Sequence, residues 1–340
     1  MGQRGNSFDM NEIVKDTQEK ILDVLSDGEF HSGEDLGQKL GMSRAAVWKQ
    51  LQKLEELGLE LESVKGTGYR LTGGLELLQS EVIKAYFSEI STRDFPACLI
   101  YPSLESTNQL ARQMADEGGC DGTVVLAERQ TDGRGRRGKH WVSPFASNIY
   151  MSLIWNFETG AAALEGLSLA IGVAVRRALV SVGVKNVQLK WPNDIYINQK
   201  KLGGILLEMT GDPAGQCSVV VGVGINVSMP AQYGRSIDQQ WTDIISELPI
   251  RISRNQLVAA LIEEILVILQ LYHQTGFAPY REEWLSADAF KGARGTLSTI
   301  KESINGEIVG VDDSGAIQLK LKDGNVKSFI GGELSLRRAQ

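Results

Sequence analysis

The sequence predicts an α+β protein of several domains, in which a winged helix-turn-helix, a mixed sheet covered by helices and a small β-barrel follow one another. Three observations support this fold class. Residues 13–72 have the pattern of three helices followed by a two-stranded hairpin. In residues 95–288 apolar strands cluster and most helices separate them singly, which is typical of a sheet with a helical cover. After Gly292 short strands alternate with turns, which indicates a barrel.

The length, composition and cysteine count are those of a globular protein from a reducing compartment. The chain has 340 residues, 42% of them hydrophobic, and a net charge of -7, so it can form several domains and is no general polyanion binder. Its three cysteines have no metal-type spacing, which argues against disulfides and a zinc site. Apolar stretches look too short or interrupted to span a bilayer, and residues 1–12 read as an extension without a signal peptide. We expect a cytoplasmic protein without membrane association or resident metal.

The first domain is predicted at residues 13–74. A helix is expected at Ile13–Leu25, and Ser32 is a suitable N-cap for a second helix that ends near Leu40. Ser43 caps a third helix, which presents apolar residues at three- and four-residue spacing until about Leu57. The hairpin Leu59–Leu71 with its glycine turn completes a winged helix-turn-helix.

The basic residues of this domain are concentrated on its third helix and its wing. The domain is acidic overall, yet residues 36–54 contain Lys and Arg and no acid. A winged helix used only for protein contacts is the alternative, but an outward basic strip favours DNA binding. The residues expected to contact DNA are Ser43, Arg44, Ala45, Trp48, Lys49, Lys65 and Arg70.

A linker is predicted at residues 75–94, with a short helix near residues 80–87. The central domain, residues 95–288, is expected to contain a long apolar helix at residues 161–182 and a candidate edge strand at residues 202–209. The barrel is predicted at residues 289–340.

The stretch Gly133–Gly138, called here the arginine loop, has the strongest chemical signal in the chain. It alternates three glycines with three arginines and lies between two predicted core strands. Glycine allows close approach to a ligand, and arginine binds phosphate or carboxylate oxygens in pairs. A disordered Arg/Gly tail would lack flanking apolar strands, whereas a plain solvated loop would leave three arginines to repel one another. The loop therefore predicts an anion site, and it is not a Walker loop because no Gly-Lys-Ser/Thr opens a helix.

An ordered set of motifs resembles the bacterial bifunctional biotin–protein ligases that also repress the biotin operon. The set covers essentially residues 13–338, and each motif alone is weak. The resemblance implies a central domain like that of class II aminoacyl-tRNA synthetases and an SH3-like C-terminal barrel. The motifs are Gly28-Glu29-Phe30-His31-Ser32-Gly33, Ser43-Arg44-Ala45-Ala46-Val47, the arginine loop, Lys190-Trp191-Pro192-Asn193-Asp194, Lys201-Leu202-Gly203-Gly204-Ile205-Leu206 and Gly222-Val223-Gly224-Ile225-Asn226.

The resemblance implies a two-step reaction and a switch. Biotin and ATP, with Mg²⁺, would give biotinyl-5′-AMP, and a lysine of the biotin carboxyl carrier protein of acetyl-CoA carboxylase would then take the biotin. The bound adenylate would act as corepressor, so that a homodimer forms and binds the biotin operator. The carrier protein would compete for the dimer surface.

The resemblance also implies the site residues. The catalytic residues would be Arg136, Lys190 and Lys201. The biotin-binding residues would be Ser106, Thr107, Asn108, Gln130, Gly133, Arg134, Gly135, Arg136, Lys201, Gly203 and Gly204. The nucleotide-binding residues would be Arg134, Arg136, Arg137, Trp141, Lys190, Asn193, Asp194 and Asn226.

Some of these residues have a plain structural alternative. Ser106 and Thr107 suit a helix cap, and Trp141 suits core packing. Asn193 and Asp194 suit a turn after Pro192 as well as a nucleotide or its Mg²⁺. Lysines are usually solvated, but Lys190 follows apolar strand residues, where an unpaired ammonium is costly.

Two other functions remain open from the sequence. One is a lipoate- or other acyl-ligase of the same superfold, because a fold does not fix its substrate. The other is a ligand-sensing repressor without ligase activity. The arginine loop and the Lys-Trp-Pro-Asn-Asp strand favour biotin over lipoate, and the intact arginines and lysines argue against a repressor without ligase activity.

Overall fold

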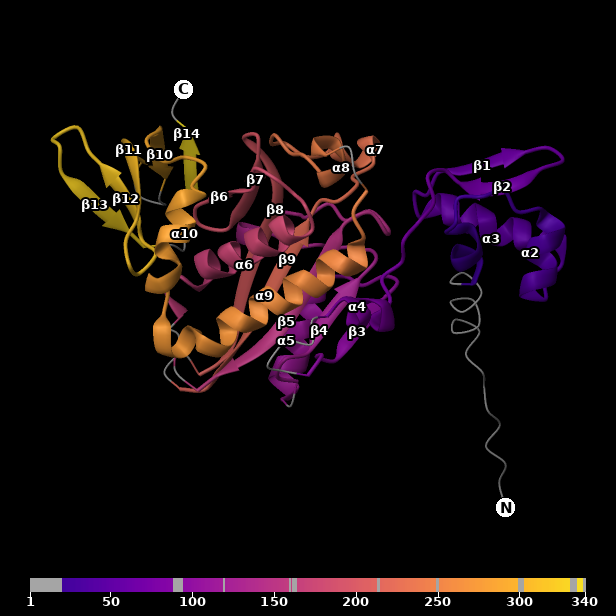
Figure 1. The fold of residues 1–340 in the computed structure, drawn as a ribbon, viewed down its shortest axis with the longest axis horizontal. Coiled ribbons are helices and arrows are strands. Elements are labelled where there is room, and N and C mark those ends of the chain that lie inside the picture. Colours follow the sequence, from indigo (N-terminus) through magenta and orange to yellow (C-terminus); the bar gives the residue numbers. More distant parts are fainter. Residues whose placement is uncertain are drawn as a thin grey trace, which may run out of the picture. The chain divides into compact units, whose positions relative to one another are not determined.

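The computed structural model describes residues 20–87, 94–118, 120–158, 160, 164–212, 215–248, 251–298, 303–330 and 335–338. The chain divides into two compact units (Figure 1). The N-terminal unit comprises residues 1–77 with 144–146, and the large unit comprises residues 78–143 with 147–340.

The N-terminal unit is a winged helix-turn-helix. Residues 20–25 are helical, while the first part of the helix expected from Ile13 lies outside the described residues. Ser32 and Ser43 cap the next two helices, because the side chain of each accepts a backbone N–H from the first turn. The elements are α2 (Gly33–Leu40), α3 (Arg44–Glu56), β1 (Leu61–Val64) and β2 (Gly68–Leu71), and the two strands pair antiparallel.

A seven-stranded mixed sheet forms the centre of the large unit. Its strand order is β3-β4-β5-β9-β8-β7-β6, in which β3 and β4 are parallel and the other neighbours antiparallel. The strands are β3 (Cys98–Tyr101), β4 (Val124–Ala127), β5 (Ile149–Phe157), β6 (Gln188–Lys190), β7 (Asp194–Ile197), β8 (Lys200–Gly211) and β9 (Cys217–Ile225).

Helices cover both faces of this sheet. Successive side chains of β4 point to opposite faces, and all four of them are buried. Val124 and Leu126 belong to the core that α6 and α9 share, while Val125 packs in a second cluster with Ala111 of α5. Figure 1 shows α6 beside α9, and these two helices are in contact. The helices are α4 (Ser80–Tyr86), α5 (Thr107–Glu117), α6 (Leu167–Ser181), α7 (Ala231–Gly234), α8 (Ile244–Glu247), α9 (Arg254–Thr275) and α10 (Arg281–Ser286).

Two sequence predictions for this unit need correction. The helix expected at residues 161–182 begins only at Leu167, because Gly166 has φ 74 and precedes it as a left-handed N-cap; residues 161–163 lie outside the described part. The expectation that no stretch is long and apolar enough to span a bilayer is also wrong. By its length and composition, helix α9 could span a bilayer. In the structure, however, 56% of its most apolar segment is buried, and the helix packs on α6 in the core.

The strand expected at the sheet edge, residues 202–209, is only partly an edge. The first part of β8 pairs with β7 on one side and β9 on the other. Asn193 still binds both backbone groups of Ile205, and from Leu206 onward β8 has register partners only on β9 among the described residues. Side chains of α5 lie along this free half, since Asn108 donates to the backbone oxygen of Leu206.

The end of the chain forms a five-stranded antiparallel sheet in the order β13-β12-β11-β10-β14. In the part of the chain that the structure describes, β13 and β14 are its edges, so the expected barrel is seen there as an open sheet. Its strands are β10 (Arg294–Ser298), β11 (Ser303–Val311), β12 (Ile317–Lys320), β13 (Val326–Phe329) and β14 (Ser335–Arg338).

The large unit begins at Leu78, earlier than the domain start predicted at residue 95. The backbone N–H of Leu78 donates to Glu128 Oε1 at 2.6 Å, and that of Gln79 donates to Asn255 Oδ1 at 2.9 Å. Glu128 also forms an ion pair with Arg254, and both side chains are only 5% exposed. These bonds attach the start of the unit to the N-terminus of α9.

Candidate active site

A cavity of about 480 Å³ opens over β5, β9 and β8 and under the arginine loop. It brings together most of the residues that the sequence predicted for biotin and nucleotide. Those that line it are Ser106, Thr107, Asn108, Gln130, Arg134, Gly135, Arg136, Arg137, Trp141, Lys190, Asn193, Asp194, Lys201 and Gly204.

One end of the cavity is neutral, polar and buried. Ser106 caps α5, so the structural alternative holds for it, and its side chain is also in the cavity wall. Gln130 Oε1 accepts the backbone N–H of Thr107 at 2.9 Å, and Gln130 Nε2 donates to Ser143 Oγ at 3.2 Å. Thr107 and Asn108 are each 4% exposed. This end can accept and donate hydrogen bonds without any net charge.

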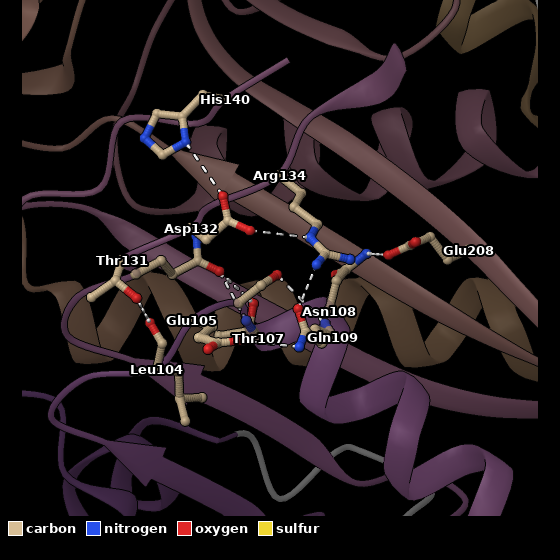
Figure 2. Close-up of polar contacts among 12 residues, drawn as sticks. Leu104, Glu105, Thr107, Asn108, Gln109, Thr131, Asp132, Arg134, His140 and Glu208 are labelled. Carbon is tan, nitrogen blue, oxygen red and sulfur yellow. Dashed lines mark hydrogen bonds and ion pairs between the residues drawn. The ribbon is translucent and has the colours of Figure 1, made fainter. Parts of the chain in front are cut away.

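The side-chain amide of Asn108 contacts residues of three neighbouring strands that are register partners. Ser152 of β5 is opposite Gly222 of β9, which is opposite Leu206 of β8. A Cβ at Gly222 would overlap Asn108 Oδ1, so only glycine leaves room for the amide. Figure 2 shows Asn108 pointing to Glu208, to which it donates at 2.8 Å.

The other end of the cavity is positively charged. Arg136 Nη1 donates to Asn193 Oδ1 at 3.2 Å, and burial together with the neighbouring charge of Arg137 lowers the pKa of Arg136. Arg137 has φ 58, in the left-handed region. Arg134 also lines the cavity; it donates to Gln109 of α5 at 2.5 Å and lies 3.8 Å from Asp132 (Figure 2). Anions are the ligands that such a cluster attracts.

Two lysines of this end share one carboxylate. Lys201 Nζ lies 2.7 Å from Asp194 Oδ1, and Lys190 Nζ lies 3.9 Å from Asp194 Oδ2. Lys190 also donates to the hydroxyl of Tyr196 at 3.1 Å, and burial followed by the charge of Asp194 raises the pKa of Tyr196 to about 12. The lysine side chains are 17% and 15% exposed, so they are not the solvated lysines of the structural alternative.

A second cavity of about 370 Å³ adjoins the first, with which it shares Trp141 and Lys201. Asn226 lines this one and not the first. Trp141 packs so closely against Gly224 that a Cβ there would overlap its ring, so Trp141 is both packed and cavity-lining. Trp241 also lines the second cavity, and sequence reasoning missed it because a single tryptophan in a turn-rich segment has no pattern.

Two predicted glycines lie behind the cavity and not in its wall. A Cβ at Gly133 would meet the backbone oxygen of Trp141, and one at Gly203 would meet Ile225. Both allow close packing of the segments that carry lining residues.

The residues predicted for DNA contact lie together on the N-terminal unit. Ser43 is also the N-cap of α3, and Trp48 is 47% exposed, with its ring 6.3 Å from that of Tyr69. Arg70 pairs with Glu62 at 2.7 Å and lies over the ring of Phe30. The exposed members of the set are Ser43, Arg44, Ala45, Trp48, Lys49 and Lys65.

Comparison with known families defines the class of protein. Residues 100–226 match the biotin/lipoate A/B protein ligase family, residues 17–70 match a helix-turn-helix domain, and residues 299–337 match the biotin protein ligase C-terminal domain. The solved biotin protein ligase of Aquifex aeolicus, in complex with biotin and ATP, superposes with a TM-score of 0.62 at 27% identity; it covers 72% of this chain and 100% of its own. A biotin ligase with an added helix-turn-helix domain is the class that these matches describe.

Full-length relatives identify the family. The bifunctional ligase/repressor BirA of Escherichia coli is 40% identical over 94% of this chain and 97% of its own length. The protein of the same name from Bacillus subtilis is 32% identical over 91% of this chain and 94% of its own. The chain belongs to the family of bifunctional biotin ligase/repressors. The predicted fold class and the combined ligase and repressor functions are thereby confirmed.

Proposed function

We propose that the large unit activates biotin with ATP at this cavity and transfers it to a lysine of the biotin carboxyl carrier protein of acetyl-CoA carboxylase. The observation that carries the proposal is the division of the cavity. Its neutral end fits an uncharged ureido ring, which has two N–H donors and one carbonyl acceptor. Its charged end fits the carboxylate and the phosphates that must react with each other.

In the first step a carboxylate oxygen of biotin attacks the α-phosphorus of ATP. A carboxyl–phosphate bond forms, the bond to the β-phosphate oxygen breaks, and pyrophosphate leaves with the electron pair. The two reactants are both anions, so neutralising their repulsion is the main task of the protein. Arg136 and Lys190 supply positive charge at this end of the cavity, where Arg136 donates to Asn193 and Lys190 lies 3.9 Å from Asp194.

Asp194 gives the lysines a defined position before the ligand binds. Its carboxylate lies 2.7 Å from Lys201 and 3.9 Å from Lys190, so it holds both ammonium groups at the cavity wall. An arriving carboxylate or phosphate replaces part of this pairing and finds the positive charge already oriented. The remaining proposed anion contacts are those of Arg134, Gly135 and Arg137.

The second cavity is proposed to take the adenine. Asn226 is 3% exposed, and its Oδ1 has no hydrogen-bond partner among the described residues, while its Nδ2 donates to Thr242. A buried acceptor without a donor is costly, and the exocyclic amino group of adenine is a donor of suitable kind. Trp141, at the junction of the two cavities, offers the flat surface on which a base stacks.

Magnesium is proposed only as the counter-ion of ATP. Among the described residues there is no group of three or more His, Cys, Asp or Glu side chains that could hold a metal, so the donor set does not fit a resident ion. Mg²⁺ commonly binds through substrate phosphates with one or two carboxylates, and Asp194 is the carboxylate nearest the lysines.

In the second step the amine of the carrier lysine attacks the acyl carbon of biotinyl-5′-AMP. An amide bond forms, the bond to the phosphate oxygen breaks, AMP leaves and the amine loses a proton to solvent. The arginine loop covers the mixed anhydride until the carrier arrives, which protects it from water.

The repressor function is proposed to use the α3 face and an adenylate-dependent homodimer. One winged helix reads a single half-site, so a palindromic operator requires two. The free half of β8 offers backbone groups for pairing with a second copy, and the carrier protein would compete for this edge. The cytoplasm is the compartment in which carrier and operator are both present.

A carrier assay read by mass tests the ligase proposal. The full-length protein is incubated with ATP, Mg²⁺, a carrier domain and either biotin or lipoate. We expect the carrier mass to increase by one biotinyl group and to stay unchanged with lipoate. A lipoyl adduct without a biotinyl adduct would establish the acyl-ligase alternative, and no adduct with either acid would favour a repressor without ligase activity.

Sedimentation and footprinting test the repressor proposal. We expect dimers with biotin and ATP and monomers without them, and protection of a palindromic site only under the first condition. A dimer that forms equally well with and without biotin and ATP would contradict adenylate-dependent dimerisation. Protection by a truncated protein that lacks residues 1–72 would contradict the assignment of DNA binding to the N-terminal unit.

A further inference from the structure

The orientation of the Asn108 amide is fixed by a residue outside the cavity wall. Asn108 Nδ2 donates to Glu208 Oε2 at 2.8 Å and to the backbone oxygen of Leu206 at 3.3 Å. A carboxylate and a carbonyl can only accept, so the NH₂ group of the amide must face them. The carbonyl oxygen of Asn108 therefore faces the other way, toward Ser152.

Ser152 has a single hydroxyl proton and two oxygen neighbours. Its Oγ lies 2.6 Å from Asn108 Oδ1 and 2.8 Å from Thr107 Oγ1, and Ser152 is completely buried. Asn108 Oδ1 has no proton to give, so it takes the proton of Ser152. The shorter of the two distances agrees with this choice.

The direction of the Thr107 hydroxyl follows from the same reasoning. With the Ser152 proton used, Thr107 can direct its own proton to Ser152 Oγ at 2.8 Å or to Gln130 Oε1 at 3.2 Å. Both partners lie within the protein, so a lone pair of Thr107 remains for the cavity that this residue lines. Thr107 thus meets a ligand as a hydrogen-bond acceptor.

We propose that Glu208 and Ser152 are positioning residues that set Thr107 as the acceptor for a ring N–H of biotin. The four residues Glu208, Asn108, Ser152 and Thr107 are called here the polar relay. Neither Glu208 nor Ser152 lines the cavity, so both act through residues that do. The inference rests on the proposed biotin end of the cavity. It adds the reason why Thr107 would bind a ligand that offers a hydrogen-bond donor in preference to one that offers an acceptor.

A purely structural role for Glu208 would be to attach α5 to β8. The structure provides that attachment elsewhere on the same two elements, since Thr210 of β8 donates to Asp116 of α5. Thr210→Val is therefore a matched control, because it breaks a helix–strand bond without touching the relay.

The test uses Glu208→Gln in the full-length protein, with biotin and its two cyclic carbamate analogues. Each analogue replaces one ring N–H by oxygen. A glutamine amide at this position can donate to Asn108 and allows its amide to turn over, so that Thr107 is no longer held as an acceptor. We expect KM for biotin in adenylate formation to increase about three- to tenfold, the range of one hydrogen bond, with a smaller change in kcat.

The selectivity between ligands separates the relay from a structural effect. The analogue that places an oxygen opposite Thr107 should bind weakly to the wild type. Its KM should stay the same or decrease in Glu208→Gln. Ser152→Ala removes the middle of the relay and should reduce the same selectivity. Thr210→Val should change all three KM values equally or not at all.

Equal losses for biotin and both analogues in Glu208→Gln, or no loss for biotin, would overturn the relay. Thermal midpoints measured on the same samples show whether each variant is folded, and Ser152→Ala decides the case if Glu208→Gln is not. A wild-type protein that makes no adenylate from biotin would instead refute the proposed function.

Discussion

The two ends of the cavity are built in opposite ways. At the neutral end, Asn108 in the first turn of α5 and Ser152 in β5 are buried, and strand register places Ser152, Gly222 and Leu206 opposite one another. At the charged end, the arginine loop connects two strands, and the Arg134 side chain is 43% exposed. The neutral end is therefore formed before any ligand arrives, whereas the charged end has surface contacts that a ligand can replace.

This difference separates recognition from retention. Buried hydrogen bonds with fixed donors and acceptors discriminate between ligands, because an unsuitable ligand leaves a buried group unpaired. Exposed ion pairs such as Arg134 with Asp132 are weak and salt-sensitive, so they are easily exchanged for a ligand anion. We expect mutations at the neutral end to change which acid is used and mutations at the charged end to change how long the adenylate stays.

Arg136→Gly should have the largest effect on retention. It removes the guanidinium that bridges the loop to Asn193, which the structure records at 3.2 Å. Loss of one or two charge-assisted bonds predicts about ten- to a hundredfold faster adenylate dissociation. Single-turnover release of radiolabelled adenylate measures it, and biotin on bystander lysines should increase in parallel. Unchanged release would mean that the loop does not hold the adenylate.

Lys190→Ala should reduce adenylate formation by about tenfold or more, because it removes positive charge from the reacting phosphates. Lys200 of β8 lies in the same sheet but outside the cavity wall, is 48% exposed and pairs with Glu247, so Lys200→Ala is the matched control. Pyrophosphate release and the thermal midpoint are measured for both variants. If Lys190→Ala loses stability and activity in the same proportion, the lysine is structural.

Lys201→Ala should depress adenylate formation in a similar way, with a larger effect on biotin binding. Its ammonium is the closer of the two to Asp194 and lies over the Trp141 ring at 5.5 Å. Biotin titration without ATP separates binding from chemistry. An unchanged biotin affinity would restrict Lys201 to the nucleotide.

Asp132→Asn should have a smaller effect, in the opposite direction. The carboxylate lies 3.8 Å from Arg134 and 3.9 Å from His140, and it competes with a ligand anion for them. Its removal should slow adenylate dissociation about twofold at low salt, in the range of an exposed ion pair. The difference should disappear at high salt, and a difference that persists there would have another cause.

Asp288→Asn should change stability with pH and have the smallest effect on catalysis. Burial raises the pKa of Asp288 to about 6, and its Oδ2 has no hydrogen-bond partner among the described residues. Because the folded protein holds this proton more tightly than the unfolded chain, Asp288 destabilises the fold increasingly as pH rises from about 4 to 6. The thermal midpoint of the variant should therefore exceed that of the wild type more at pH 7 than at pH 4. A constant difference would contradict the raised pKa.

The charged end could be predicted from the sequence better than the neutral end. Arginine, glycine and lysine motifs are local, so the arginine loop and Lys190-Trp191-Pro192-Asn193-Asp194 stand out in one reading of the chain. The winged helix could also be predicted from the sequence, because the helix caps Ser32 and Ser43 and the spacing of apolar residues are local signals.

The polar relay could not be predicted, because its members come from α5, β5 and β8 and meet only through strand register. Gly222 illustrates the difficulty: its place under Asn108 depends on β9 lying between β5 and β8. The edge strand predicted at residues 202–209 was only partly correct for the same reason, since the pairing of the first part of β8 with β7 is set by topology and not by composition.

The attachment of Leu78 to Glu128 has a practical consequence for dissecting the protein. A ligase fragment that starts at residue 95 would lack α4, and it would leave Glu128 and Asn255 without the N–H groups that they accept. Ile83 of α4, which is fully buried, would also be missing from the core. Limited proteolysis of the whole protein should therefore yield a stable large fragment whose first residue lies before Leu78, and expression trials of the isolated ligase are best begun from that cut.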